Sequence, residues 1–167
     1  RLCTVPPLPI INTGADPTIC AGATVQLAVT GAATYSWSPV TGLSCTTCPN
    51  PVASPAATTT YVVTGTTAAG CSDTAHVTVN VVNNPAVTAT ATNPAFCAGD
   101  STQLQASGAT TYSWSPATGL SCTTCANPTA TPPVTSTYTV TGISGSGCSD
   151  PASVTITVNP LRGVSAG

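Results

Sequence analysis

The sequence is an internal duplication, and this feature constrains its fold more than any other. A shift of 77 residues places residues 16–83 on residues 93–160 without a gap, and about 40 of the 68 aligned positions are identical. The blocks YSWSP and TGLSCTTC occur once in each half. Self-similarity at one fixed period indicates a repeated structural unit. We therefore predict two tandem copies of one domain.

Apolar and polar residues alternate within each copy. Val25, Leu27 and Val29 alternate with polar or small residues, and the same alternation runs over 75–81 and 152–158. A period of two places one set of side chains inward and the other toward solvent, as in half-buried strands. Turn-rich stretches such as 50–55 and 67–73 separate the strands, and no segment has a helical period. About seven short strands in about 75 residues predict an all-β fold of two small β-sandwiches.

The expected domain boundaries follow from the repeat. Repeat 1 covers 9–82, a short linker covers 83–85, and repeat 2 covers 86–159. Residues 1–8 are expected to end a preceding strand and joint, and 160–167 to form a joint and the first strand of a following repeat or subunit, because 4–14 aligns with 157–167. Two interpretations stay open: a window of a longer array, or terminal strands that complete a neighbouring subunit in a head-to-tail polymer.

Charged residues are unusually scarce. The chain has two Lys or Arg and four Asp or Glu in 167 residues, so 4% is charged, against about 25% in a typical soluble domain. Binding to nucleic acid needs several cations to replace counterions, and the composition excludes it. No apolar run approaches the roughly 20 residues of a membrane span. A polar surface with so little charge favours self-association or a sugar coat.

Nine cysteines indicate an oxidising compartment, and we expect a secreted or cell-surface protein. Four cysteines in each repeat allow three pairings. We expect a small loop staple from each CTTC motif, with the remaining two cysteines of each repeat joined to one another. The expected pairs are Cys45–Cys48, Cys20–Cys71, Cys122–Cys125 and Cys97–Cys148.

Two further cysteine hypotheses are open. Cys20, Cys45, Cys48 and Cys71 could form a four-thiolate zinc site, although zinc ribbons use two CxxC knuckles and each repeat has one. Cys3 has no counterpart and is a candidate for a bond to another subunit, a bond to a preceding repeat, or a buried free thiol. We predict no metal site and no cofactor.

The aromatic residues are expected to belong to the core. Tyr35 and Trp37 lie two apart on one expected strand and therefore share a face. Tyr61 opens a later strand and is expected to anchor a corner through its hydroxyl. The alternative role is a stacking platform for sugar rings. The expected core aromatics are Tyr35, Trp37, Tyr61, Tyr112, Trp114 and Tyr138.

No catalytic constellation is present in the sequence. His76 is the one histidine, and Ser153 takes its place in repeat 2. Four scattered Asp and no Glu supply neither paired glycosidase carboxylates nor a calcium cage. We predict that the chain is not an enzyme.

The strings ICAGATVQL, YSWSPVTGLSCTTCPNPVASPAATTTYVVTG and GCSDTAHVTV, with FCAGDSTQL and YSWSPATGLSCTTCANPTATP in the second copy, resemble the PKD-like, immunoglobulin-like repeats of Bacteroidetes secreted and cell-surface proteins. The resemblance implies disulfide-braced immunoglobulin-like sandwiches in adhesins or stalks. It also implies O-glycans at Asp-Ser/Thr motifs, here Thr74 and Ser101. One departure is that Tyr61 stands ten residues before Cys71, whereas antibody-type domains place Tyr two residues before the second core Cys.

These observations together predict a structural subunit or repeat of an extracellular filament or adhesin stalk, assembled head-to-tail through its terminal strands. The expected partners are copies of the chain itself or neighbouring repeats, with covalent glycans. One alternative is a carbohydrate- or surface-binding module. Another is a passive spacer in a large secreted multidomain enzyme.

Overall fold

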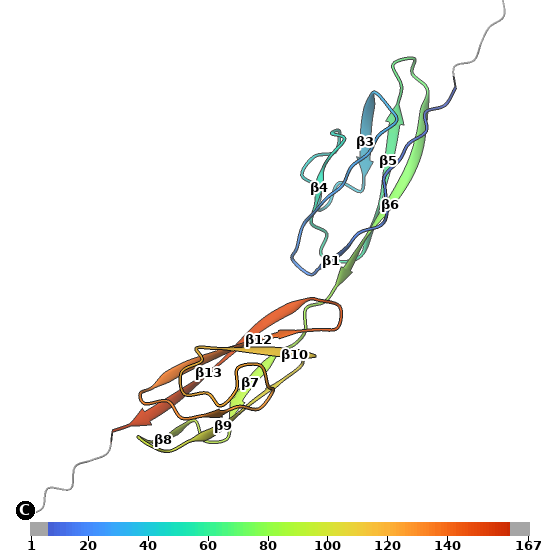
Figure 1. The fold of residues 1–167 in the computed structure, drawn as a ribbon. Coiled ribbons are helices and arrows are strands. Elements are labelled where there is room, and N and C mark those ends of the chain that lie inside the picture. Colours follow the sequence, from blue (N-terminus) through green and yellow to red (C-terminus); the bar gives the residue numbers. More distant parts are fainter. Residues whose placement is uncertain (1–6, 161–167) are drawn as a thin grey trace, which may run out of the picture. The chain divides into compact units, whose positions relative to one another are not determined.

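A computed structural model describes residues 7–160, and every regular element in this range is a β-strand (Figure 1). The chain divides into two compact units between Asn83 and Asn84. We call them repeat 1 and repeat 2. Cys3, with the rest of 1–6 and 161–167, lies outside the described residues.

Repeat 1 has a four-stranded sheet in the order β1-β6-β5-β3 and a separate pair, β2-β4. The long hairpin of β5 and β6 is its centre, with eight antiparallel residue pairs from Thr59↔Val79 to Thr66↔Ser72. β1 is short and runs parallel to the end of β6. The strands are β1 (Thr18–Cys20), β2 (Val25–Gln26), β3 (Thr34–Ser38), β4 (Val52–Ala53), β5 (Thr59–Thr66) and β6 (Ser72–Val82).

Repeat 2 has the same plan with a more complete second sheet. Its four-stranded sheet has the order β10-β12-β13-β8, and the second has the order β11-β9-β7. The bridge between Asn12 and Thr30 stands in repeat 1 where β7 pairs with β9 in repeat 2. The strands are β7 (Thr88–Ala91), β8 (Ala95–Cys97), β9 (Thr102–Ser107), β10 (Thr111–Ser115), β11 (Thr129–Ala130), β12 (Ser136–Ile143) and β13 (Ser149–Asn159).

The strand order of repeat 2 is that of an immunoglobulin-type sandwich. Such sandwiches group strands A, B and E in one sheet and C, F and G in the other. Here β7, β9 and β11 form the first group, and β10, β12 and β13 form the second. The first strand is divided, because β7 pairs with β9 whereas β8 pairs in parallel with β13. The all-β expectation is confirmed.

Each repeat has its own apolar core, built from the inward faces of its strands. In repeat 2 the core contains Leu104, Trp114, Tyr138 and Val140, each at most 3% exposed. Val140 stands two residues after Tyr138, where an antibody-type domain carries the second cysteine of its inter-sheet disulfide. Aliphatic packing therefore occupies the place of that inter-sheet disulfide, and a disulfide of repeat 2 lies instead in its CTTC loop.

The expected pairs Cys20–Cys71 and Cys97–Cys148 are wrong. Cys20 lies opposite Val82 at the end of β6, whereas Cys71 directly precedes the start of this strand. Eleven steps of a strand at about 3.3 Å each separate the two ends by about 35 Å, and a disulfide needs Cα atoms within about 7 Å. The same argument applies to repeat 2, where Cys97 lies opposite Asn159 and Cys148 directly precedes β13.

Each repeat has two distinct ends. The hairpin end holds the turn between the two longest strands, 67–71 in repeat 1 and 144–148 in repeat 2. The exit end holds the close of the last strand, at Val82 or Asn159, with the parallel strand beside it. The chain enters each repeat at the hairpin end, where a Cβ on Gly31 or Gly108 would collide with the carbonyl oxygen of Ile10 or Ala86. Only glycine permits this close approach of two backbones.

Candidate interaction surfaces

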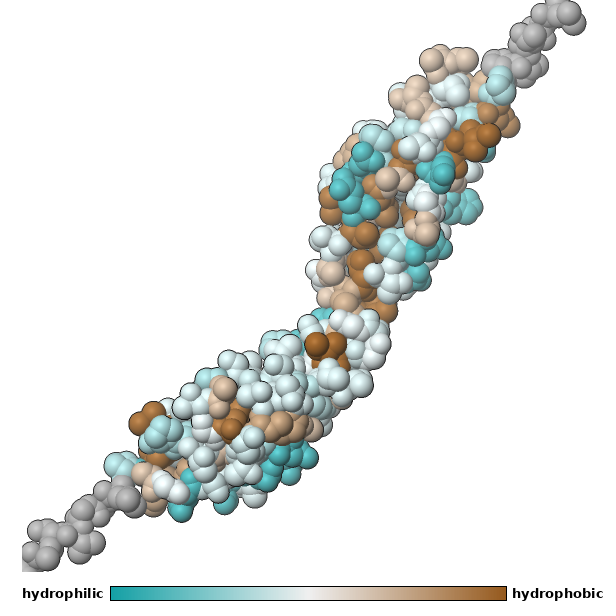
Figure 2. All heavy atoms as spheres, in the orientation of Figure 1, coloured by the Kyte–Doolittle hydropathy of each residue, from teal (hydrophilic) through white to brown (hydrophobic). Residues whose placement is uncertain are grey.

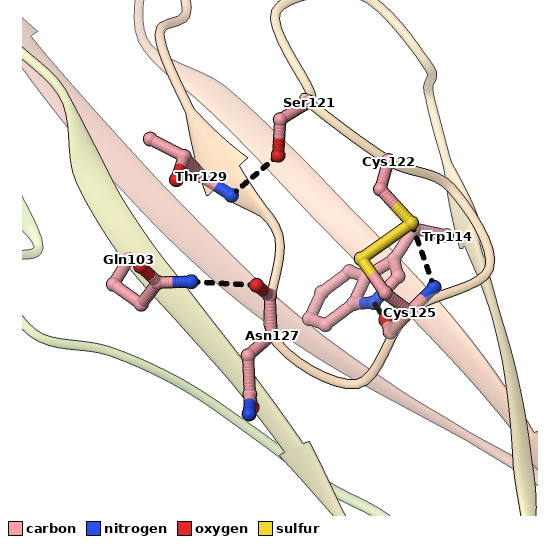
Figure 3. Close-up of a disulfide and its surroundings, with 7 residues drawn as sticks. All are labelled: Gln103, Trp114, Ser121, Cys122, Cys125, Asn127 and Thr129. Atoms are coloured by element: carbon pink, nitrogen blue, oxygen red, sulfur yellow. Dashed lines mark hydrogen bonds between the residues drawn. A yellow bond between two sulfur atoms is a disulfide. The ribbon is translucent and has the colours of Figure 1, made fainter.

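The CTTC loop of repeat 2 is a closed staple over the core tryptophan (Figure 3). Cys122 and Cys125 form a disulfide with their Cα atoms 5.9 Å apart. The Cys125 amide donates to the Cys122 sulfur at 2.9 Å, and the Trp114 indole N–H donates to the Cys125 carbonyl oxygen at 3.0 Å. The staple therefore presents the one acceptor that satisfies the buried indole.

The neighbouring loop residues hold the staple in place. Gln103 Nε2 donates to the Asn127 carbonyl oxygen at 2.6 Å, and the Thr129 amide donates to Ser121 Oγ at 2.9 Å (Figure 3). Since both ends of the loop are bonded to strands or to their continuation, the loop is a structural brace.

Repeat 1 carries the same staple. Cys45 and Cys48 are disulfide-bonded, and the Trp37 indole N–H donates to the Cys48 carbonyl oxygen at 2.9 Å. Both staples agree with the pairs expected from the sequence. The zinc hypothesis does not fit, because Cys20 and Cys71 lie at opposite ends of β6. The described residues hold no group of three or more His, Cys, Asp or Glu that could bind a metal ion.

The aromatic side chains lie in the cores rather than on a binding face. Trp37 and Trp114 are 2% and 3% exposed, and Tyr61 and Tyr138 are fully buried. The Tyr61 hydroxyl donates to the Thr41 carbonyl oxygen at 3.0 Å, and the Tyr138 hydroxyl to that of Thr118 at 2.9 Å. Burial raises the pKa of both tyrosines above 10.0. These four rings are unavailable for stacking on sugars.

Tyr35 and Tyr112 are half-buried and packed against the cores. Each hydroxyl donates to a carbonyl oxygen three residues earlier, at Ala32 and Ala109, and accepts from the amide of that same residue. They close the turns that precede β3 and β10. All six expected core aromatics therefore have structural contacts.

The outward face of the β3-β5-β6 sheet is a neutral array of hydroxyls. Opposed positions such as Thr34↔Thr66, Ser36↔Thr64 and Thr64↔Thr74 carry Ser or Thr on the face away from the core. Thr60 and Thr78 are joined across the sheet by a 2.9 Å hydroxyl contact, as are Thr137 and Thr155 in repeat 2. Figure 2 shows one side of both units, which is white or pale over much of its area, with teal areas on both units and brown areas that are more extensive on repeat 1. We call the outward face of the β3-β5-β6 sheet, with its equivalent in repeat 2, the hydroxyl face.

Other polar residues named in the sequence analysis lie on exposed parts of both repeats. His76 is exposed on β6, opposite Val62. Thr74 and Ser101, the expected glycan acceptors, are exposed, as are Asp73 and Asp100 beside them. Their positions leave room for a modification. No helix in the described part of the chain is long and apolar enough to cross a membrane.

An apolar groove of about 530 Å³ lies at the exit end of repeat 2. Ala98, Pro133, Val134, Thr135, Val158 and Pro160 line it. Val134 is 66% exposed, and the adjacent Cys97 is an exposed free thiol. The alternation pattern did not reveal this groove, because Pro133 and Val134 stand in a loop before β12. A sequence signal existed in the comparison of the repeats, since repeat 1 has Ala56 and Ala57 there.

Comparison with known proteins finds similarity to this chain among solved structures only. No family model and no curated protein matches the chain. Murine CEACAM1b aligns with 91% of this chain and 100% of that chain, at 12% identity and a TM-score of 0.40. The insect immune protein hemolin aligns with 90% of this chain and 47% of that chain, at 11% identity and a TM-score of 0.43. A bacterial ice-binding adhesin aligns with 92% of this chain and 66% of that chain, at 17% identity and a TM-score of 0.40. The strand order given above, and not these alignments, defines the fold.

Proposed function

We propose that the chain is a structural subunit of an extracellular filament or adhesin stalk, whose copies join head-to-tail through their terminal strands. The observation that carries this proposal is the burial of Trp37, Trp114, Tyr61 and Tyr138. A module that binds soluble sugars by stacking needs exposed rings, and these rings brace the cores instead. Two similar sandwiches, each with its own apolar core, are suited to act as load-bearing or spacing units of a stalk.

The surface supports the same proposal. A neutral hydroxyl face has little electrostatic repulsion between copies, so association depends on shape and apolar contact at the ends. The four sulfurs of the two staples brace units of about 80 residues, which are small for a stable core. Those disulfides support an oxidising location, which in this proposal is outside the cell.

Negative-stain electron microscopy of unreduced material from its source tests the proposal. We expect long uniform fibres with an axial repeat of one two-repeat unit. Isolated short rods at every concentration would refute assembly and leave the passive spacer. The candidate bond at Cys3 is tested on the same material, since non-reducing mass spectrometry would detect a linked Cys3 peptide.

The hydroxyl face supports a second candidate, adhesion to a hydroxyl-rich surface such as an insoluble polysaccharide. Its hydroxyls stand at the fixed spacings of a sheet, about 4.8 Å between strands and about 6.6 Å along them. Binding to polysaccharide beads that is lost when Ser36 and Thr64 are both changed to Val, with unchanged thermal stability, would support this candidate.

A further inference from the structure

The exit ends of the two repeats share a hydrogen-bonding arrangement but differ in the side chains that line them. In each repeat a threonine hydroxyl accepts from the amide of the last strand at 3.0 Å, Thr58 for Val81 and Thr135 for Val158. The residues before these threonines differ. Ala56 and Ala57 in repeat 1 are replaced by Pro133 and Val134 in repeat 2. The exit end followed by another repeat in this chain thus has small side chains, and the other has larger apolar ones.

The segments that lead into the two repeats differ in the same way. Structural equivalence is fixed by the glycine contacts, since Ile10 meets Gly31 as Ala86 meets Gly108. Leu8 and Ile10 are therefore equivalent to Asn84 and Ala86. Leu8 is 65% exposed and Ile10 is 86% exposed, whereas Pro9 between them is buried, like Pro85. Repeat 1 thus exposes two large apolar side chains at the positions where repeat 2 has a polar and a small residue.

We propose that the groove at the exit end of repeat 2 binds the segment 7–10 of a second copy, with Leu8 and Ile10 against Pro133, Val134 and Val158. This inference rests on the proposed head-to-tail assembly and names its contact surfaces. The groove and the segment both carry large apolar side chains at positions where the equivalent surfaces of the other repeat have small or polar ones. Each surface is therefore suited to an apolar contact with another molecule. Exposed apolar side chains that meet on association are removed from water, which favours the complex.

A second copy is favoured as the occupant because each copy carries both members of the contact, the apolar groove lining in repeat 2 and the exposed Leu8 and Ile10 in repeat 1.

Matched variants test the contact without introducing foreign residues. The tail variant Pro133→Ala with Val134→Ala gives repeat 2 the lining of repeat 1. The head variant Leu8→Asn with Ile10→Ala gives repeat 1 the lead segment of repeat 2. Because the chain already folds with these residues at equivalent positions, both variants are expected to keep the wild-type melting temperature. Val40→Ala, which shortens another exposed side chain (63%), is the control.

Assembly is measured by sedimentation and electron microscopy over a concentration series. We expect each variant to raise the concentration needed for fibres about tenfold or more, as loss of one to two buried aliphatic side chains implies, with no change for Val40→Ala. Tail-variant copies keep an intact head. Mixed in a minor amount with wild type, they are expected to cap fibre ends and shorten the fibres. Alkylation of Cys97, read by peptide mass spectrometry, should slow on assembly of the wild type.

The outcomes separate the two proposals. Fibres of wild type that the head and tail variants form equally well would overturn the groove contact and leave head-to-tail assembly intact. A wild type that never assembles would overturn both. A tail variant with lowered thermal stability and normal assembly would show that the chain's own residues fill the groove, which also overturns the inference.

Discussion

Removal of the Cys122–Cys125 staple tests whether this disulfide orders the acceptor for Trp114. The double change Cys122→Ser with Cys125→Ser opens a loop of four residues. The chain-entropy relation assigns about 2 kcal/mol to such a small loop. The Trp114 indole, which is 3% exposed, donates to the Cys125 carbonyl oxygen at 3.0 Å, and this hydrogen bond adds about 1 kcal/mol to stability.

A double-mutant cycle separates these two contributions. Trp114→Phe removes the indole donor and leaves an aromatic ring in the core. If the staple positions the carbonyl, part of the hydrogen bond is already lost in the Ser variant, so Trp114→Phe costs less there than in the wild type. We expect a coupling free energy of about 1 kcal/mol between the two sites.

Peptide-resolved hydrogen exchange in a urea series is the assay, because it reports the unfolding free energy of repeat 2 while repeat 1 serves as an internal reference. The equivalent cycle in repeat 1, with Cys45, Cys48 and Trp37, is a second measurement of the same quantity. Additivity within about 0.3 kcal/mol in both repeats would refute the role of the staple as a positioning element.

Two other substitutions test the structure. Gly108→Ala is expected to destabilise repeat 2 by about 2–4 kcal/mol, because a positive φ costs about 1 kcal/mol and the collision with the Ala86 carbonyl adds about 1–3 kcal/mol. The control Gly147→Ala, at a positive φ but with no neighbour within 4 Å, should cost about 1 kcal/mol. Equal melting temperatures of the two variants would contradict the close approach. Tyr138→Phe with Tyr61→Phe is expected to weaken the pH dependence of stability above pH 10. Burial raises the pKa of both tyrosines, so their contribution is present below pH 10 and is lost as pH rises toward the folded-state pKa; alkaline melting curves of wild type and variant with the same slope would disprove this.

Much of the fold follows from local pattern. The repeat, the strand alternation and the CTTC staples depend on neighbours in sequence, and the structure has all three. The first expected strand, 24–30, is regular only at Val25–Gln26 in repeat 1. Beyond it, the Leu27 and Val29 amides donate to the carbonyl oxygens of Pro51 and Pro49, and proline has no N–H to donate in return. The regular pairing of hydrogen bonds therefore ends where the opposite segment contains Pro49 and Pro51.

The long-range cysteine pairing could not be derived in the same way. Alternation tells which face of a strand is buried, but not which end of a distant strand lies beside it. The three-residue strand β1 pairs with the close of β6, and this parallel pairing places Cys20 far from Cys71. The groove at Val134 was missed for a related reason, because it is formed by a loop, a strand end and the residue after β8, which meet only in the folded repeat.

The parallel pairing of β1 with β6 also determines how a repeat responds to pulling. The chain enters repeat 1 at the hairpin end and leaves from the end of β6, so tension along the strands draws β1 and β6 in opposite directions. The bonds from the Ala21 amide to the Val82 carbonyl, 2.8 Å, and from the Asn80 amide to the Pro17 carbonyl, 2.9 Å, are then loaded together in shear instead of opening one after another. Repeat 2 has the equivalent bonds at Ala98 and Thr157. Tension along the strands would therefore load the hydrogen bonds of the short strand β1, and of its equivalent β8, in parallel.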